Sequence, residues 1–320
     1  MKDTILFGDC RETLKNLTNS SARMCVTSPP YYGLRDYGGE KNQIGQEESP
    51  EEYVKQMVEV FRLVRDVLTD DGTLWLNIGD SYYNYRSDGN YPKQTVSKTR
   101  QDLPQSTPVR GNKLEGLKSK DLIGIPWMLA FALRADGWYL RQDIIWHKPN
   151  PMPESVKDRC TKAHEYIFLL SKSKNYFYDN EAIKEPAKDW GTRDRTNGKY
   201  HNPGSGLAPH SGLTKSYPTK NKRSVWSVTK KPYKGAHFAV FPPELIEPCI
   251  LAGSEVGDTI LDPFMGSGTS AMVAKSLGRY YTGCELHEDY GNLIQERIQN
   301  YHPVQEVAQE PTINILDLIQ

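Results

Sequence analysis

The stretch Ser28-Pro29-Pro30-Tyr31, which follows the apolar run Met24-Cys25-Val26, has residue types that could do chemistry. Each proline fixes its φ angle and has a carbonyl but no N–H. A strand that ends here therefore presents fixed hydrogen-bond acceptors and then an aromatic face. Such a surface suits a planar group that bears an NH2. Taken alone, the tetrapeptide is explained by a purely structural role, as a proline-terminated strand followed by a tyrosine-rich loop.

A second stretch with chemical potential is a glycine-rich turn between a predicted strand and a predicted helix. It contains, in order, Asp262, Pro263, Phe264, Gly266, Ser267, Gly268 and Thr269. Such a turn lets the backbone approach a ligand at the helix N-terminus, and Glu285, which ends the next predicted strand, can accept both hydroxyls of a ribose. A dinucleotide would fit the same spacing, but the G-x-G-x-x-G fingerprint is absent. No Lys follows Gly268, which removes the P-loop interpretation.

Together the two stretches resemble motif IV, (Ser/Asn/Asp)-Pro-Pro-(Tyr/Phe/Trp), and motif I of the DNA amino-methyltransferases. Nearly the whole chain can be laid against that family, and the order of its blocks resembles the β class. The resemblance implies a Rossmann-like α/β methyltransferase fold, with a mostly parallel sheet flanked by helices and with inserted recognition loops. It also implies S-adenosylmethionine as the cofactor, bound by the glycine turn, by Glu285 and by Asp9, for which a turn or helix cap is an equal alternative.

The chemistry that the resemblance implies is site-specific methylation of an exocyclic amine on a base flipped out of double-stranded DNA. The Ser28 hydroxyl and the Pro29 carbonyl would accept the amine hydrogens, and Tyr31 would stack on the base. Ser at the first position is most often seen in cytosine-N4 enzymes, so cytosine N4 is the expected target and adenine N6 the alternative. A cytosine-C5 enzyme would need a Pro-Cys nucleophile, and Pro248-Cys249 lies in a predicted helix.

Two more distant alternatives belong to other classes. A non-catalytic nucleic-acid-binding module would carry basic residues but would not need both motifs intact. An RNA or protein methyltransferase typically has Asn before Pro-Pro and would lack a large basic insert between the motifs.

That insert spans residues 181–235 and has twelve Lys and Arg against four Asp and Glu, a net charge of +8 in a chain with 40 basic and 40 acidic residues. Basic side chains neutralise phosphates and reach base edges, so the region is interpreted as the target-recognition region, although a solvated face is the alternative. The candidate DNA contacts are Arg193, Arg195, Lys199, Lys222 and Arg223. Residues 85–118 lack apolar periodicity and are interpreted as a mobile loop that closes over DNA, or as a tolerated surface insertion.

The remaining residues, 1–180 and 236–320, are expected to form one catalytic and cofactor-binding domain. Apolar patterns and turn residues predict strands at 4–7, 23–27, 73–78, 138–146, 164–170 and 280–284, and another strand just before Asp262. Helices are predicted at 11–17, from 50 to about 68, at 122–133 and from about 243 to 252, and a last helix follows the glycine turn and continues to 277. The loop Pro149–Glu154 and the strand after it are implied by the resemblance to wall the base site.

Five cysteines are widely spaced and never form a CxxC pair, which argues against a disulfide framework or a zinc site, and no metal is expected. The N-terminus has no long apolar segment, and no run approaches the length of a membrane span. A cytoplasmic protein with no membrane partner is expected. A cognate restriction endonuclease and a homodimer are partners that only the resemblance suggests.

Overall fold

The computed structural model describes residues 2–34, 43–83, 116–187, 218–230 and 241–301. Its centre is a sheet of eight strands in the order β1-β10-β9-β2-β3-β5-β4-β8. The strands are β1 (Thr4–Phe7), β2 (Ala22–Thr27), β3 (Leu68–Ile78), β4 (Tyr139–His147), β5 (His164–Ser171), β8 (Val225–Ser227), β9 (Thr259–Asp262) and β10 (Tyr280–Glu285). Neighbouring strands from β1 to β3 pair in parallel, and β5 runs antiparallel to β3 and β4. The predicted α/β fold with a mostly parallel sheet is confirmed.

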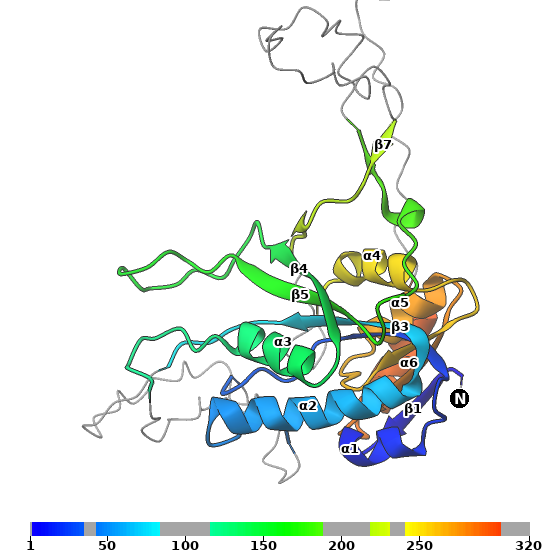
Figure 1. Ribbon diagram of the computed structural model, residues 1–320, viewed down its shortest axis with the longest axis horizontal. Coiled ribbons are helices and arrows are strands. Elements are labelled where there is room, and N and C mark those ends of the chain that lie inside the picture. The colour runs from blue at the N-terminus through cyan, green and yellow to red at the C-terminus, as the bar shows by residue number, and fades with distance from the viewer. Residues whose placement is uncertain (1, 35–42, 84–115, 188–217, 231–240, 302–320) are drawn as a thin grey trace, which may run out of the picture.

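Helices cover both faces of this sheet (Figure 1). One hydrophobic core contains residues of α1 (Cys10–Thr13), α2 (Pro50–Val67) and α3 (Ile125–Ala135), and the other contains residues of α4 (Pro243–Gly253), α5 (Thr269–Ser276) and α6 (Tyr290–Asn300). Strand β3 feeds both cores, because Leu74 and Leu76 lie in the first and Trp75 in the second. Alternate residues of a strand point to opposite faces, so the sheet is buried on both faces at its centre.

Helix α2 begins as its sequence predicts. The side chain of Ser49 accepts a hydrogen bond from the Glu52 N–H, Pro50 occupies the first turn, and two acidic residues follow. The helix ends at Val67, and β3 starts directly at Leu68. The strand expected at 73–78 therefore starts earlier, and Asp70-Asp71-Gly72 lies within it, where the pairing of β2 with β3 shifts register between Ala22 and Met24.

Helix α3 begins at Ile125 and not at Leu122, so the expected range of 122–133 was wrong at its start. Leu122 instead forms an isolated bridge with Tyr82. The carboxylate of Asp80 accepts hydrogen bonds from the Gly124 and Ile125 N–H groups, which fixes the first turn from a distant segment. Pro126 lies at the helix start.

Two other elements differ from the sequence-based expectation. The helix expected over 11–17 is shorter, because α1 is followed by the 3-10 turn η1 (Leu14–Asn16). The region 181–235, expected to be loop-like, contains the 3-10 turn η2 (Glu181–Ile183), the pair β6 (Glu185–Pro186) and β7 (Thr219–Lys220), and the edge strand β8, which pairs in parallel with β4. Most of the expected loop 85–118 lies outside the described residues.

No helix in the described ranges is long and apolar enough to cross a membrane. The part of the chain that the structure describes also holds no group of three or more His, Cys, Asp or Glu side chains that would suit a metal ion.

Candidate active site

The two motifs meet at the carboxyl ends of adjacent strands. Strand β2 pairs with β9, and Cys25 lies opposite Leu261. Just beyond this pair, at the carboxyl ends of the two strands, the Thr27 hydroxyl donates a hydrogen bond of 2.6 Å to Oδ1 of the buried Asp262. Ser28 follows Thr27 directly, so the first residue of the Pro-Pro motif is fixed relative to the start of the glycine turn. Ligands of open α/β sheets bind at this edge.

The carboxylate of Asp262 organises the glycine turn. It accepts hydrogen bonds from Thr27, from the Phe264 N–H at 3.0 Å and from the Ser270 hydroxyl at 2.5 Å. Burial raises the pKa of Asp262 to about 6, although these three donors oppose the shift. The buried Asp262 side chain therefore stabilises the turn by these hydrogen bonds. A ligand would contact Pro263 and the residues after it.

The backbone of the turn is shaped by two glycines. Gly266 has a φ of +54° and Gly268 a φ of +78°, a region that residues with a Cβ rarely adopt. A Cβ on Gly268 would also lie 2.5 Å from Ile294 of α6. Arg297 of the same helix donates to the Ser267 carbonyl and hydroxyl. Helix α6 therefore holds the turn from behind.

Glu285 closes the opposite side of the turn at the end of β10. Its Oε2 accepts the Gly266 N–H at 2.7 Å and its Oε1 accepts the His287 N–H at 3.1 Å. Burial raises the pKa of Glu285 to about 7. A carboxylate has about four acceptor positions, and these two described hydrogen bonds do not fill them, so Glu285 can still accept from hydroxyl groups of a ligand.

These residues fit S-adenosylmethionine. The buried Thr269 hydroxyl, at the start of α5, has no hydrogen-bond partner among the described residues. Positive-φ glycines let the backbone approach a ligand, a helix N-terminus attracts a negatively charged group such as the carboxylate of an amino acid, and the Glu285 carboxylate can accept from ribose hydroxyls. The side chains that would hold it are Phe264, Ser267, Thr269 and Glu285.

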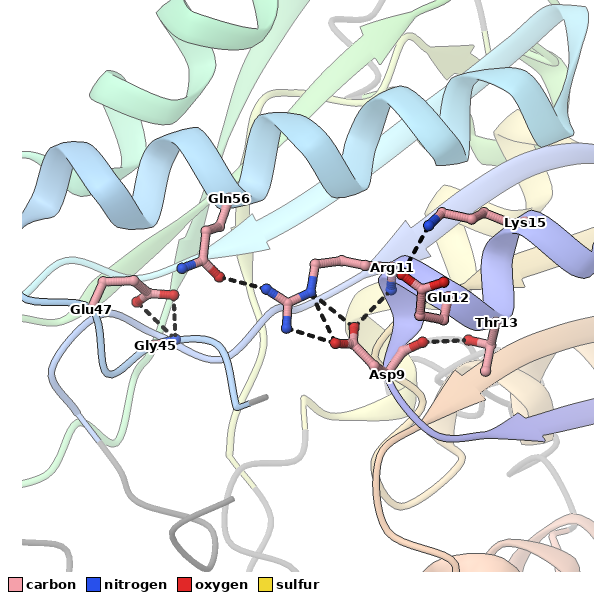
Figure 2. Close-up of polar contacts among 8 residues, drawn as sticks. All are labelled: Asp9, Arg11, Glu12, Thr13, Lys15, Gly45, Glu47 and Gln56. Atoms are coloured by element: carbon pink, nitrogen blue, oxygen red, sulfur yellow. Dashed lines mark hydrogen bonds and ion pairs between the residues drawn. The ribbon is translucent and has the colours of Figure 1, made fainter. Parts of the chain in front are cut away.

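Asp9 lies beside this site and acts as the N-cap of α1. Its carboxylate accepts the backbone N–H of Arg11 at 2.9 Å and pairs with the Arg11 guanidinium at 2.6 Å. Both contacts are drawn as dashed lines in Figure 2. Burial raises the pKa of Asp9, but the hydrogen bonds and charge of Arg11 outweigh it, and the net pKa is lowered. Arg11 also donates to Gln56 of α2, so it ties α1 to α2. The Gly8 N–H donates to the Glu285 carbonyl, which places the cap next to the end of β10.

The Pro-Pro segment is held from both sides. The Tyr53 hydroxyl of α2 donates to the Pro30 carbonyl at 2.8 Å. The Tyr31 hydroxyl donates to Oε2 of Glu165 at 2.9 Å and lies 3.5 Å from the Ser28 hydroxyl. Burial and the Glu165 carboxylate raise the pKa of Tyr31 well above its usual value. The phenol therefore stays protonated and is a hydrogen-bond donor.

Of the expected DNA contacts, Lys222 and Arg223 are described, whereas Arg193, Arg195 and Lys199 lie outside the described residues. The Arg223 side chain is 73% exposed and pairs with Glu185 at 2.9 Å. Lys222 lies 5.1 Å from the centre of the Trp226 ring. Both cations sit just before the edge strand β8.

Sequence reasoning missed four side chains of this site: Thr27, Ser270, Lys148 and Glu165. Thr27 and Ser270 directly adjoin the two motifs, so their positions were a usable signal. Lys148 and Glu165 flank the connection from β4 to β5, and no local pattern indicates the contact of Lys148 with Glu165 or that of Glu165 with Tyr31.

Comparisons with known proteins agree with this geometry. The family model described as "DNA methylase", for N6 and N4 methyltransferases, matches residues 22–296. The chain is 48% identical over 298 residues to the type II methyltransferase M.SmaI of Serratia marcescens, covering 92% of this chain and 90% of that protein. It is 47% identical over 296 residues to the type II methyltransferase M.XycI of Xanthomonas campestris pv. cyanopsidis, covering 92% of this chain and 87% of that protein.

Two solved structures share the fold. The PvuII DNA methyltransferase (cytosine-N4-specific) has a TM-score of 0.60 at 18% identity, with 94% of this chain and 89% of that chain covered. The M1.HpyAVI–SAM complex has a TM-score of 0.51 at 18% identity, with 92% of this chain and 98% of that chain covered.

The chain belongs to the N6/N4 DNA methylase family. It is a site-specific, S-adenosylmethionine-dependent DNA amino-methyltransferase, as the two motifs predict.

Proposed function

We propose that this enzyme methylates the N4 atom of cytosine in double-stranded DNA. The observation that carries the proposal is the place of Ser28, one residue beyond the Thr27–Asp262 hydrogen bond that joins the two motifs. Ser at this position favours cytosine N4. Adenine N6 remains the second candidate, because the same acceptors suit either amine.

The amine is a poor nucleophile because its lone pair is delocalised into the ring. Acceptors for its two hydrogens favour a pyramidal nitrogen with a localised lone pair. The Ser28 hydroxyl and the Pro29 carbonyl are assigned this role. The Pro30 carbonyl is engaged by Tyr53, which supports Pro29 as the second acceptor, since no described hydrogen bond ends at its carbonyl. Tyr31 provides the aromatic surface for the base.

S-adenosylmethionine supplies an electrophilic methyl group when bound. The protein's part is to hold the cofactor and to place the amine in line with that methyl. Asp262 shapes the turn, and Glu285 accepts the ribose hydroxyls. Asp9 is proposed to contact the cofactor through its position beside β10, in addition to its observed role as a cap.

The other proposed assignments concern DNA and partners. The order of the motifs supports the β class, and the base is proposed to be flipped out, because the amine is inaccessible within a duplex. Residues 181–235 are proposed to read the target, with Arg193, Arg195, Lys199, Lys222 and Arg223 near the phosphates. The relatives named type II methyltransferases support a cognate restriction endonuclease. A homodimer and a cytoplasmic location are further proposals.

The experiment is incubation of the enzyme with S-adenosylmethionine and unmethylated genomic DNA, followed by nucleoside mass spectrometry. N4-methylcytosine that disappears with Ser28→Ala supports the proposal. Ser21→Ala is the matched control, since Ser21 lies before β2, at the other end of the strand, and its hydroxyl donates to the Thr18 carbonyl. N6-methyladenine would retain the acceptor mechanism but overturn the choice of base.

A further inference from the structure

A continuous series of polar contacts runs from a buried lysine to Ser28. The Lys148 ammonium contacts Oε1 of Glu165, the Tyr31 hydroxyl donates to Oε2 of Glu165 at 2.9 Å, and the Ser28 hydroxyl lies 3.5 Å from the Tyr31 oxygen. Lys148 is only 6% exposed. We call these four side chains the Lys148–Ser28 network.

The hydrogen bonds of the Lys148–Ser28 network run in a fixed direction from donor to acceptor. A lysine ammonium only donates and an ionised carboxylate only accepts. Glu165 therefore takes the single hydrogen of the Tyr31 hydroxyl, and the lone pairs of that oxygen are left to accept from Ser28. Once Ser28 donates its hydrogen to Tyr31, its own lone pairs face the substrate.

Two neighbours reinforce this direction. The Asn77 side-chain nitrogen donates to the Tyr166 carbonyl at 3.1 Å, which turns Oδ1 of Asn77 toward the Tyr31 hydroxyl at 3.4 Å. Among the described residues, Tyr31 thus meets a second acceptor and no donor other than Ser28. The ring is also fixed in place, because a Cβ on Gly79 would lie 2.6 Å from its Cε2 atom.

We propose that Glu165, held by Lys148, is a positioning residue that acts through Tyr31 to make Ser28 a hydrogen-bond acceptor for the target amine. This inference rests on the proposed role of Ser28. The 3.5 Å contact is at the outer limit of a hydrogen bond, and catalytic hydrogen bonds often tighten only with substrate bound. The Lys148–Ser28 network explains why the Lys148–Glu165 ion pair is buried next to the Pro-Pro motif, where desolvation of charged groups is costly.

The test uses Glu165→Gln, Tyr31→Phe and the double variant, with labelled S-adenosylmethionine and unmethylated DNA amplified in vitro. In Glu165→Gln the amide oxygen accepts from Lys148 and the NH2 faces Tyr31. The Tyr31 hydrogen is then shared between Asn77 and Ser28. We expect kcat to fall about tenfold, with the KM for DNA changed less than about twofold.

The double variant separates positioning from simple structural support. If Glu165 acts through the Tyr31 hydroxyl, Glu165→Gln lowers kcat by less than about twofold in the Tyr31→Phe background. Losses that multiply would overturn the inference, as would an unchanged kcat in Tyr31→Phe. Asp136→Asn is the matched control, since it breaks the Arg62–Asp136 ion pair beyond the far end of α3.

A second readout does not depend on activity. In protein labelled with ¹³Cζ-tyrosine, the Tyr31 signal, assigned with Tyr31→Phe, should shift in Glu165→Gln and stay in place in Asp136→Asn. If wild-type enzyme methylates no DNA base while this signal shifts, the proposed function fails and the hydrogen-bond direction stands. If DNA is methylated but the signal does not move, the inference fails and the function stands.

Discussion

The Thr27 hydroxyl and the Asp262 carboxylate, 235 positions apart in the sequence, are joined by a hydrogen bond of 2.6 Å. They lie at the carboxyl ends of β2 and β9, which pair in parallel. Because Ser28 follows Thr27 and the glycine turn follows Asp262, this bond sets the distance between the base acceptor and the cofactor turn. An error in that distance would misplace the amine relative to the methyl group, and transfer rates are sensitive to such errors.

Replacing Thr27 by Val removes the hydroxyl and keeps the shape of the side chain. The buried Asp262 then loses one of its three donors, so we expect unfolding free energy to fall by about 1 to 2 kcal/mol and S-adenosylmethionine to bind more weakly. Urea denaturation and calorimetric titration measure the two effects. Thr27→Ser keeps the hydroxyl and should retain most of both, so equal losses in Val and Ser variants would contradict this account.

The pH dependence of stability should carry a signature of the two buried carboxyl groups. Burial raises the pKa of Asp262 to about 6 and that of Glu285 to about 7. Between about pH 4.5 and 7 the folded chain binds more protons at these groups than the unfolded chain, so their contribution to stability is present at low pH and is lost as pH rises. Glu285→Gln should flatten the decline by up to about 1.4 kcal/mol per pH unit.

Urea denaturation at several pH values from 5 to 8 checks this, with Asp136→Asn as a variant that keeps both carboxyl groups. Parallel curves for wild-type enzyme and Glu285→Gln would show that Glu285 titrates normally in the folded state.

The parts of the site that the sequence predicted are those encoded by contiguous residues. Ser28 to Tyr31 and Asp262 to Thr269 each combine turn chemistry with a preceding apolar strand, so their positions at strand ends followed from local patterns. The strand order, in which β9 lies next to β2, then brought the two segments together at the same edge of the sheet.

What the sequence left out depends on long-range contacts or weak patterns. Glu165 is 134 positions from Tyr31, and nothing near either residue indicates their hydrogen bond. Helix α6 was not predicted, and Ile294 is its single fully buried residue. Strand β8 has only three residues and is fixed by pairing with β4. Tertiary pairing determined these elements.

Gly79 is expected to be needed for the placement of Tyr31. A Cβ at this position would lie 2.6 Å from Cε2 of the Tyr31 ring and 3.4 Å from Cγ of Glu165. Gly79→Ala should therefore lower stability by about 1 to 3 kcal/mol and reduce kcat. Thermal denaturation measures the first effect. In a Tyr31→Ala background the added methyl should be tolerated, and a cost that persists there would place the strain elsewhere.

Arg223 and Lys222 should contribute to DNA affinity through phosphates and not through base identity. Arg223 is exposed just before β8, and its pairing with Glu185 is a surface ion pair that competes only weakly with DNA. Replacing either by Gln should weaken binding to all sequences alike and lower the slope of log K against log salt by about 1, because one fewer counterion is released. Fluorescence anisotropy with labelled duplexes over a salt series measures the slope.

Lys15→Gln is the control, since Lys15 pairs with Glu12 of α1, and the slope of this variant should equal that of wild-type enzyme. An unchanged slope in Arg223→Gln and Lys222→Gln would remove these residues from the DNA interface, whereas an effect restricted to one sequence would make them base readers.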